Sequence, residues 1–432
     1  MAVVCESAAG WLLDELALVN KWYEAGGGLG GGAPPLLHNE QDTKDTKASY
    51  KLREDFFRLY KPYFTLQPAP APAETCAPQS DSALSRCPRV RKKRKRPIAY
   101  NQGELDALEY HKAINDLISE GSRLLIQEGF NKGLLHSPSG SEEQESKIVS
   151  KLYGNKKNLA DLCDMSKDMP LVSLPEYAVK VLDTESPFSH DGDYLLHITE
   201  NASDFPQIIH IMGEQYLIPP KSNFLLSDIS YMDPLLHYKK YGIIVIDPPW
   251  ENKSVKRSKR YNSLSPSKIK ELPIPAMAAP DCLVITWVTN RQKHLRFVKE
   301  ELYPHWSIRS LAEWHWVKIT QSGEFVFPID SVHKKPYEIL VLGRLMHLDN
   351  STSRELETSL PPIPEHKIIV SVPCSLHSHK PPLSEVLKEY VKPDVERLEL
   401  FARNLQPGWT SWGNEVLKFQ HMDYFIPPET EN

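Results

Sequence analysis

One short segment of the chain joins residue types that could take part in a chemical reaction. An aliphatic run at 243–246 is followed directly by Asp247, Pro248, Pro249 and Trp250. The two prolines lack backbone N–H groups, so a strand must stop there, while their carbonyls remain as rigid acceptors. Asp247 and the Pro248 carbonyl could accept the two protons of an exocyclic amine, which turns the nitrogen lone pair toward an electrophile. Trp250 could then stack on the base that carries the amine.

The alternative interpretation of this segment is a strand-ending turn with Trp250 in the hydrophobic core. A generic Asp-Pro pair favours that turn, whereas the complete tetrapeptide after an aliphatic run favours a site. An amine attached to an aromatic base is a poor nucleophile, so alignment is most of what such a site can contribute.

The elements around the segment must hold these residues in place. After about residue 223, short apolar runs alternate with helix-like patterns, the clearest at 292–303 and 383–391. Strands that alternate with helices predict a parallel, doubly wound α/β sheet. In such a sheet the chemistry lies at the carboxyl ends of the strands, which is where Asp247 falls. The strand candidates are 241–247, 282–289, 312–319, 337–344, 367–373 and 397–403.

The chain before residue 223 divides into three regions by composition. Residues 1–66 hold an apolar stretch at 11–13, which we interpret as part of an amphipathic helix, and a glycine-rich linker at 26–32. Residues 67–98 are rich in Pro, Ala and Ser and have too few large apolar side chains to offset the entropy of ordering, which predicts a disordered linker. Residues 99–222 combine helical spacing with short apolar runs, which predicts a smaller mixed α/β accessory domain before the domain at 223–427.

The overall composition is that of a folded protein outside the membrane. Of the 432 residues, 41% are hydrophobic and 25% charged, and no apolar run approaches the roughly 20 residues needed to cross a bilayer. The 51 basic and 56 acidic side chains give a net charge of −5, so binding to nucleic acid must come from local basic patches. The six cysteines form no CxxC pair, which favours a reducing compartment.

Two other chemistries are disfavoured by the motifs. No GxGxxG follows the first strand candidate, which argues against a dinucleotide-dependent oxidoreductase. Cys374, His377 and His379 lie close together in the sequence, but a fourth ligand at suitable spacing is missing. We therefore expect no metal site.

The tetrapeptide and several further motifs resemble those of the adenine-N6 methyltransferases of the MT-A70 family. The resemblance covers roughly residues 223–425 and implies a Rossmann-like fold. It also implies S-adenosylmethionine as the methyl donor, S-adenosylhomocysteine as the product and adenosine as the acceptor. The matching motifs are LLSDIS at 225–230, WVT at 287–289, EWHWVK at 313–318, HKKPYE at 333–338, SHKP at 378–381 and ELFARNLQPGWTSWGNE at 399–415.

The resemblance assigns several residues to the cofactor. It implies that Asp247 lies between the methionine part of the cofactor and the target amine, and that Lys380 holds the cofactor carboxylate. Other family members carry two more residues between the matches of Arg403 and Asn404, and they usually have Gln where this chain has Glu415. The remaining implied contacts are with the adenine end, by Asp228 and Ile229, and with the ribose, by Arg403, Asn404, Asn414 and Glu415.

A basic loop directly after the tetrapeptide indicates a nucleic-acid substrate. The loop lies at the mouth of the expected site and is suited to a phosphate backbone, with a solvated surface loop as the alternative. By resemblance, Tyr261 closes over the methyl donor or the base, and Glu338 touches the target adenine beside the basic pair Lys334 and Lys335. The basic loop contains Lys253, Lys256, Arg257, Lys259 and Arg260.

The choice of polymer does not follow from the residues, because RNA and DNA differ at the 2′-hydroxyl and nothing in the sequence shows which of the two is read. The resemblance implies RNA, specifically 2′-O-methyladenosine in a small nuclear RNA of the U2 type, with DNA adenine as the alternative. We expect the accessory domain to help hold the nucleic acid. A non-catalytic nucleic-acid-binding scaffold and a small-molecule N-methyltransferase, which would not need the basic loop, stay open as other classes.

Location and partners are expectations from one further segment. The basic cluster at 89–96 predicts recognition by the nuclear import machinery and a nuclear location, ahead of the cytosol and the mitochondrion. Catalytic partners in this family often work as heterodimers, but the accessory domain could let this chain act alone.

Overall fold

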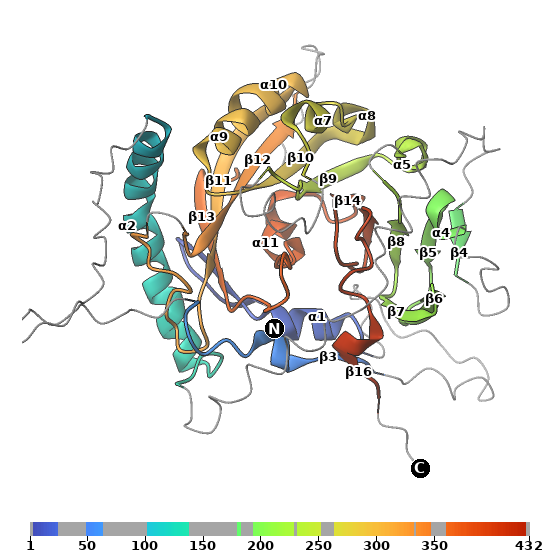
Figure 1. Cartoon of the computed structure of the whole chain (residues 1–432), viewed down its shortest axis with the longest axis horizontal. Helices are drawn as coiled ribbons and strands as arrows, with labels where there is room; N and C mark the ends of the chain where they lie inside the picture. The colour runs from blue at the N-terminus through green and yellow to red at the C-terminus, as the bar shows by residue number, and fades with distance from the viewer. Residues whose placement is uncertain are drawn as a thin grey trace, which may run out of the picture.

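One twelve-stranded sheet organises the described part of the chain (Figure 1). Its strands come from the N-terminal region, the accessory region and the C-terminal half. The computed structural model describes residues 3–24, 49–63, 102–137, 179–182, 193–228, 231–251, 263–331, 334–346 and 360–428.

Five parallel strands form the centre of this sheet. They run in the order β10 (Ala278–Val288), β9 (Tyr241–Ile246), β14 (Arg397–Leu400), β15 (Trp409–Trp412) and β8 (Ser222–Leu225). Every neighbouring pair in this group is parallel. Their carboxyl ends therefore share one edge of the sheet, where the sequence predicts a site.

The other strands extend the sheet on both sides. β12 (Tyr337–Leu345) is antiparallel to β10 and to β11 (Ile308–Lys318), so β12 begins at the edge where those two strands end. Beyond β11 lie the parallel strands β13 (His366–Ser371) and β2 (Gly10–Leu13) and the antiparallel edge strand β1 (Val3–Glu6). At the other end, β5 (Ile198–Asn201) is antiparallel to β8 and parallel to β4 (Val179–Val181).

The strands after residue 223 confirm the predicted α/β class. The six strand candidates correspond, in chain order, to β9, β10, β11, β12, β13 and β14. The sheet is mixed rather than wholly parallel, because β12 returns in the opposite direction between β10 and β11.

Helices cover both faces of the central strands. On β9, Ile244 and Ile246 face one core, whereas Ile243 and Val245 face the other, as the two-residue period of a strand requires. Because both faces are buried, the strand reads as a continuous aliphatic run. The first core contains α7 (Pro266–Lys270), α8 (Ile274–Met277), α9 (Gln292–Arg296), the π-helical turn η5 (Phe297–Leu302) and α10 (Tyr303–His305), and the second contains α11 (Ser384–Leu387) and the 3₁₀ turn η6 (Lys388–Tyr390).

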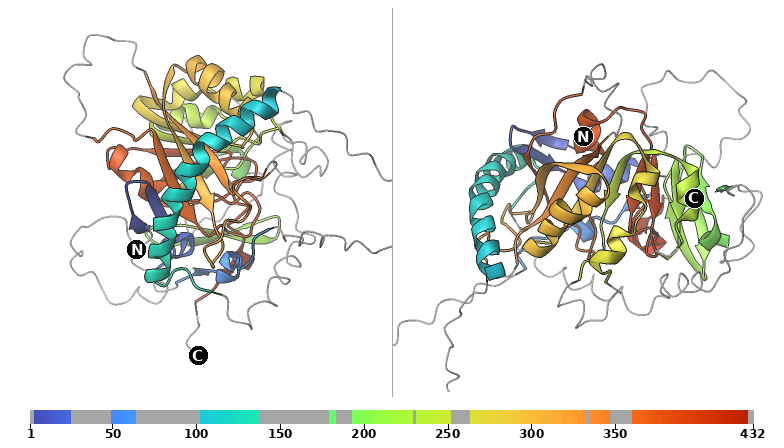
Figure 2. Two further views of the ribbon diagram at one scale, coloured as in Figure 1. Left: turned by 90° about the vertical axis from the view of Figure 1, so that its left-hand side faces the viewer. Right: turned by 90° about the horizontal axis from the view of Figure 1, so that it is seen from above.

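A single long helix, α2 (Gln102–Asn131), covers the sheet next to β11, β13 and β2. Figure 2 shows it lying obliquely across these strands. It buries Ile114, Ile118 and Leu125 in one core with Val317 and Ile368 of the sheet. The helical spacing in the predicted region 99–222 is thus confirmed for 102–131, and the helix packs on the twelve-stranded sheet itself.

The N-terminal apolar stretch is a strand, and the prediction of an amphipathic helix there is wrong. Residues 11–13 lie in β2, which pairs with β13 on one side and β1 on the other, and all three are buried. Gly10 has a φ of +155°, and a Cβ added to it would lie 1.8 Å from the carbonyl oxygen of Ile368. Only glycine fits so close to a neighbouring backbone. Pairing on both sides outweighs the helical pattern, and helix α1 begins only after Asp14, which caps it.

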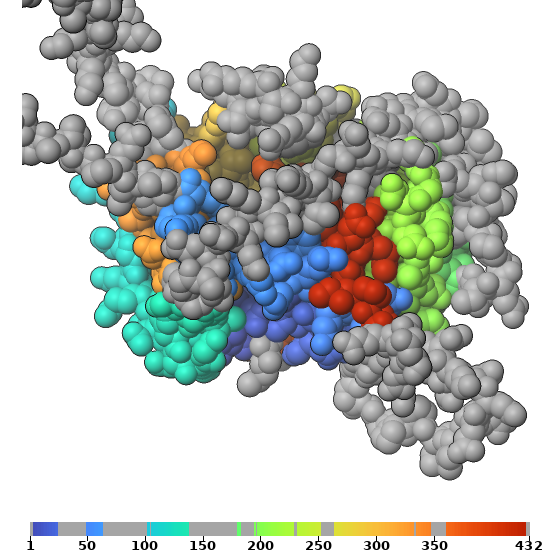
Figure 3. Space-filling model, turned by 60° about the horizontal axis from the view of Figure 1, so that its bottom comes forward, coloured from blue at the N-terminus to red at the C-terminus, as the bar shows by residue number. Residues whose placement is uncertain are grey.

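Short elements join the N-terminal and C-terminal residues on one face. Figure 3 shows the blue N-terminal residues beside the red C-terminal ones on this face. Segments of the regions predicted as 1–66, 99–222 and 223–427 therefore belong to one folded unit. The elements of this face are α1 (Glu15–Lys21), β3 (Lys51–Leu52) with β16 (Phe425–Ile426), η1 (Glu54–Phe57) and η7 (Met422–Tyr424). The remaining short elements are β6 (Gln207–Ile211) with β7 (Glu214–Ile218), α4 (Asp193–Leu196) and α5 (Asp233–Tyr238).

Within the described residues, no helix combines the length and apolar character needed to cross a membrane.

Several predicted features lie outside the described residues. The features outside are the linkers at 26–32 and 67–98, the basic cluster at 89–96, and Ile229, Lys253, Lys256, Arg257, Lys259, Arg260 and Tyr261.

Candidate active site

Residues far apart in the sequence meet at the carboxyl edge of the sheet. Asp247 follows β9 directly, and Glu338 lies at the start of the antiparallel β12. Lys380 follows β13 by a longer turn, and Arg403 follows β14. Asp228 follows β8, and Asn414 and Glu415 follow β15. The parallel arrangement of the strands brings these groups to one edge.

Asp247 is the centre of this cluster. Its carboxylate is buried, with 7% of the residue exposed. The oxygen Oδ2 accepts a hydrogen bond from Nη1 of Arg403 at 2.6 Å and lies 3.5 Å from Nζ of Lys380. Two cations therefore stabilise its charge on one side. The sequence placed Arg403 on the ribose, and its contact with Asp247 was missed.

Lys380 links Asp247 to a second carboxylate. Its Nζ lies 2.9 Å from Oε2 of Glu338, whose other oxygen forms an ion pair with Lys318. Burial disfavours the charge of Glu338, but Lys318 and Lys380 outweigh it and hold the pKa of Glu338 well below its ordinary value. Burial likewise disfavours the charge of Lys380, but Asp247 and Glu338 raise its pKa above the ordinary value. Glu338 and Lys380 are therefore both charged at neutral pH.

Aromatic rings lie next to the two lysines. Lys380 Nζ is 5.3 Å from the ring centroid of Trp287, and Lys318 Nζ is 4.2 Å from that of Trp316. The two indoles are themselves in edge contact, with centroids 5.8 Å apart. Attraction to the ring faces restricts where the ammonium groups can move. Lys318 ends both the EWHWVK motif and strand β11, and a cation at the carboxyl end of a buried strand was the signal that could have identified it.

Arg403 also contacts the acidic residue that follows β15. Its Nε lies 3.3 Å from Oε2 of Glu415, whose Oε1 accepts a hydrogen bond from Lys418 at 2.9 Å. Burial opposes the charge of Arg403, but Asp247 and Glu415 raise its pKa. Burial opposes the charge of Glu415 as well, and Lys418 and Arg403 lower its pKa. The ion pair of Asp247 with Arg403 thus lies next to the ion pair of Glu415 with Lys418.

The rest of the tetrapeptide is only partly as predicted. Trp250 is buried in the core, stacks on His294 with ring centroids 4.8 Å apart, and donates from Nε1 to the carbonyl of Trp287 at 2.8 Å. This is the core position given as the alternative, so the stacking of Trp250 on a base is not supported. The apolar side chains around the end of β9 leave the indole no open face. The ring instead braces the turn that carries Asp247.

Both proline carbonyls already accept one hydrogen bond. The Pro248 carbonyl accepts from the backbone N–H of Trp250 at 2.8 Å, and the Pro249 carbonyl from that of Leu264 at 3.0 Å. A carbonyl oxygen has a second lone pair, so Pro248 can still accept a proton from a substrate amine. The bond to Leu264 fixes the end of the turn.

Asn404 lies apart from the charged cluster. It lines a small internal cavity together with His379, Val19 and Phe419. The structure places Arg403 and Asn404 in different surroundings. Of the residues assigned to the ribose, Arg403 and Glu415 contact each other.

Glu399 is a buried acidic residue that the motif contained but the sequence analysis did not single out. It lies on β14 and accepts a hydrogen bond from Nε2 of Gln406 at 3.1 Å. Burial, with a smaller contribution from the charge of Asp247, raises the pKa of Glu399 to about 7. An acid inside a buried strand was the signal that could have identified it.

We expect Glu399→Gln to stabilise the protein at high pH. Because the folded state raises this pKa from 4.5 to about 7, the stability linked to the proton is present below pH 4.5 and is lost as pH rises toward 7. The glutamine side chain carries no charge, so the variant should be more stable by about 3 kcal/mol above pH 7 and by nothing near pH 4. Thermal unfolding from pH 4 to pH 8 measures this difference. Exposed Glu396→Gln is the control, and an equal gain there would contradict the prediction.

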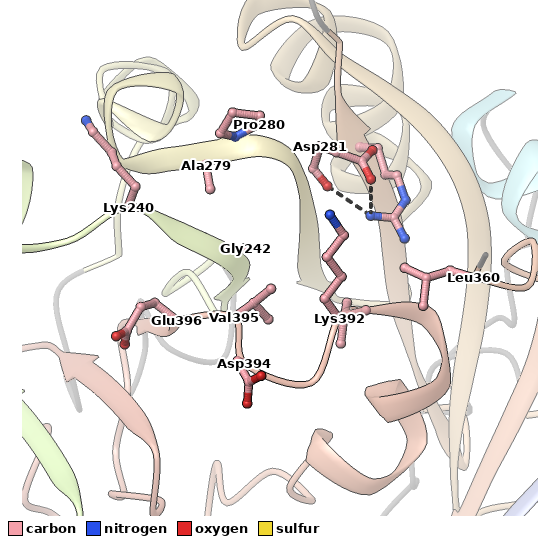
Figure 4. A pocket seen from close by; sticks show the side chains of 12 residues that line it. Lys240, Gly242, Ala279, Pro280, Asp281, Leu360, Lys392, Asp394, Val395 and Glu396 are labelled. Carbon is pink, nitrogen blue, oxygen red and sulfur yellow. Dashed lines mark hydrogen bonds and ion pairs between the residues drawn. The ribbon is translucent and has the colours of Figure 1, made fainter. Parts of the chain in front are cut away.

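A pocket at the opposite edge of the sheet contains none of the predicted site residues. Figure 4 shows Lys240, Asp281, Lys392, Asp394 and Glu396 around it. It has a volume of about 400 Å³ and lies at the amino ends of β9, β10 and β14. Its mixed charges are largely paired with one another or with the backbone, as for Arg344 and Asp281 at 3.3 Å.

The candidate metal ligands do not form a cluster. Cys374 and His379 are buried, whereas His377 is exposed and lies 2.6 Å from Oγ of Ser378. In the described ranges, no group of three or more His, Cys, Asp or Glu side chains has a geometry that could hold a metal ion.

A mixed α/β sheet whose five central strands are parallel, with a charged carboxyl edge that follows a DPPW turn, is the arrangement expected of a Rossmann-like methyltransferase. Residues 241–415 match the MT-A70 family model. The chain is also 48% identical, over 100% of both chains, to the human N(6)-adenine-specific methyltransferase METTL4. The chain belongs to the MT-A70 family of methyltransferases.

Two other relatives match about half of the chain. The N6-methyladenosine RNA methyltransferase MTA1 of Pyricularia oryzae is 34% identical over 50% of this chain and 58% of its own length. The DNA N6-methyl methyltransferase of Caenorhabditis elegans is 35% identical over 51% of this chain and 59% of its own length. One of these two relatives is named as an RNA methyltransferase and the other as a DNA methyltransferase.

The charged edge fits the methyl donor on which this family depends, S-adenosylmethionine. Its amino-acid end carries a carboxylate and an ammonium, and the site offers Lys380 and Asp247 next to each other. Its ribose diol can bind to a carboxylate, and Glu415 is present beside Arg403. Because cations and anions alternate here, a zwitterion can bind without leaving a buried charge unpaired.

Proposed function

We propose that this chain transfers a methyl group from S-adenosylmethionine to N6 of an adenine in RNA, specifically 2′-O-methyladenosine in a small nuclear RNA of the U2 type. The observation that supports this proposal most directly is the buried carboxylate of Asp247, held by Lys380 and Arg403 at the end of β9 and directly before Pro248. Support for adenine N6 comes from family membership and from the names of the relatives, and support for RNA comes from the fungal relative.

In this proposal the cofactor supplies an electrophilic methyl group on a sulfonium, and the protein aligns the amine. Asp247 Oδ1 and the Pro248 carbonyl accept hydrogen bonds from the two N–H groups of the amine, so the nitrogen lone pair points along the path of transfer. As the N–CH₃ bond forms, the S–CH₃ bond would break to leave neutral S-adenosylhomocysteine, and one of the two amine protons would pass by way of Asp247 to solvent. Lys380 and Arg403 keep Asp247 in place. Lys318 and Lys380 hold Glu338 in its charged form, in which it can accept a hydrogen bond from the target adenine.

The experiment that tests the proposal is transfer of tritium from labelled S-adenosylmethionine. The substrates are a short small-nuclear-RNA oligonucleotide, with and without the 2′-O-methyl group, and a DNA oligonucleotide of the same sequence. We expect label on the 2′-O-methylated RNA above all. If label appeared on DNA alone, DNA would take the place of RNA as the proposed substrate, which is the alternative that the nematode relative favours. Cofactor binding without label on any oligonucleotide would favour a non-catalytic scaffold or an essential missing partner.

We expect neutral substitutions in the basic loop to weaken RNA binding and to reduce its dependence on salt. The variant replaces Lys256, Arg257, Lys259 and Arg260 by neutral residues. For single-stranded RNA, each lost phosphate contact should reduce the slope of log binding constant against log salt concentration by about 0.7. Titrations of labelled RNA from about 50 to 200 mM salt measure this effect. Substitution of the exposed Lys388 and Lys392, near the opposite-edge pocket, is the control. Unchanged methyl transfer in the loop variant would favour a small-molecule substrate.

The remaining expectations concern the cell and the rest of the chain. We propose that the basic cluster at 89–96 binds the nuclear import machinery and that the protein acts in the nucleus. We propose also that α2 and the strands before residue 223 support the nucleic-acid site from within one folded unit, which would allow the chain to act without a catalytic partner.

A further inference from the structure

A buried carboxyl group from the N-terminal segment lies beneath the turn that carries Lys380. Glu15 is the first residue of α1, directly after β2 and the capping residue Asp14. β2 pairs in parallel with β13, in a register that sets Leu13 opposite Ser371. Because these two strands end together, the start of α1 and the turn after β13 lie at the same edge as the active site.

One oxygen of Glu15 has a defined partner. The side chain is fully buried, and Oε1 accepts a hydrogen bond from the hydroxyl of Ser371. Ser371 in turn accepts from Nε1 of Trp316 at 2.8 Å. Trp316 is the indole beneath Lys318. The carboxyl group is therefore part of a chain of contacts that leads to the substrate side of the site.

The other oxygen of Glu15 faces a histidine. Oε2 lies 3.9 Å from Nδ1 of His379, which is itself almost completely buried. Among the described residues, neither atom has a hydrogen-bond partner. Two buried polar atoms that face each other without another partner gain most by bonding to each other.

The protonation of the two groups suits such a bond. Burial raises the pKa of Glu15 to about 8, against smaller opposite effects of Ser371 and the charge of Lys318. Burial, together with the charge of Lys380, lowers the pKa of His379 to about 4. At neutral pH a protonated carboxyl group therefore meets a neutral imidazole. Since Oε1 accepts from Ser371, the proton belongs on Oε2, the atom that faces Nδ1.

His379 sets the geometry of the turn that presents Lys380. Its ring packs against Phe57 and Phe419, with centroids 6.4 and 5.0 Å away. The preceding Ser378 has a φ of +70°, a strained value for a residue with a side chain, so surrounding contacts must hold this turn. Lys380 follows directly and reaches both Asp247 and Glu338.

We propose that Glu15 is a positioning residue that fixes His379, and through it the turn that aims Lys380 at the cofactor carboxylate. This inference rests on the proposed function, because it needs Lys380 to bind the cofactor. It gives the N-terminal segment a part in cofactor binding, although this segment lies more than 200 residues before the tetrapeptide.

The test is calorimetric titration of the full chain with S-adenosylhomocysteine, together with kcat and KM for S-adenosylmethionine. Glu15→Ala is expected to raise the Kd by about tenfold and KM in parallel, with little change in kcat at saturation. Glu15→Gln should retain near-normal affinity, because an amide can accept from Ser371 and donate to Nδ1 of His379. Leu18→Ala is the control, since Leu18 is equally buried on α1.

A second variant keeps the test valid if Glu15→Ala unfolds. His379→Phe preserves the aromatic packing and removes Nδ1, so it should raise the Kd to the same extent. The inference is overturned if His379→Phe binds as the wild type does, or if Leu18→Ala weakens binding as much as Glu15→Ala. Wild-type protein that binds no cofactor would overturn the proposed function and this inference with it. Weakening by Lys380→Met alone would overturn only the inference.

Discussion

Replacement of Asp247 by asparagine is expected to lower kcat for methyl transfer by about 10³-fold, while the protein stays folded. The amide has no charge to align the amine, and its NH₂ group would point at Arg403 or at the substrate nitrogen as a competing donor. The measurement is label transfer at saturating cofactor and oligonucleotide, so that kcat is separated from binding. KM for the oligonucleotide should change much less than kcat.

The matched control for this variant is Asp281→Asn. Asp281 also forms an ion pair with an arginine, Arg344 at 3.3 Å, but it lies at the opposite edge of the same sheet. It should keep wild-type kcat. If Asp247→Asn retained more than about a tenth of the wild-type kcat, the role of Asp247 as acceptor of the amine protons would have to be given up.

The second large effect is expected for Lys380→Met. The substitution removes the cation that lies 3.5 Å from Asp247 and 2.9 Å from Glu338, and methionine keeps most of the volume. The variant cannot form a charge-assisted hydrogen bond with the cofactor carboxylate, so the Kd for S-adenosylhomocysteine should rise roughly 100-fold. Titration calorimetry measures it, with thermal unfolding recorded beside it.

Two comparisons make the result on Lys380 specific. Lys392→Met removes an exposed cation near the opposite-edge pocket and should leave the Kd unchanged. Lys380→Arg keeps the charge but not the compact ammonium, so it should recover only part of the affinity. A Kd for Lys380→Met within threefold of the wild type would show that the cofactor carboxylate binds elsewhere.

The sequence by itself determined the class of fold and the position of Asp247 within it. A continuous aliphatic run marks a strand buried on both faces, and two prolines after it mark the strand end, so the residue order alone puts Asp247 at the carboxyl end of a central strand. The recurring apolar runs likewise identified β10 to β14. These features are local, because each depends on residues that are neighbours in the chain.

Other features depended on contacts that no local pattern encodes. Residues 11–13 read as helical, yet β13 and β1 pair with them on both sides and Gly10 permits the close approach. From the sequence, Trp250 was interpreted as a ring on which a base could stack, but in the structure it is buried against His294. In both cases tertiary burial outweighed the local signal.

The electrostatics of the site could only come from the tertiary structure. Lys318, Glu338, Lys380 and Arg403 are separated in the chain, and only the fold brings their charges into contact. Glu15 shows this most clearly, since its residue type and spacing gave no sign of a site. Parallel pairing of β2 with β13 places it under His379, because strands that run in one direction end at one edge and bring distant residues together there.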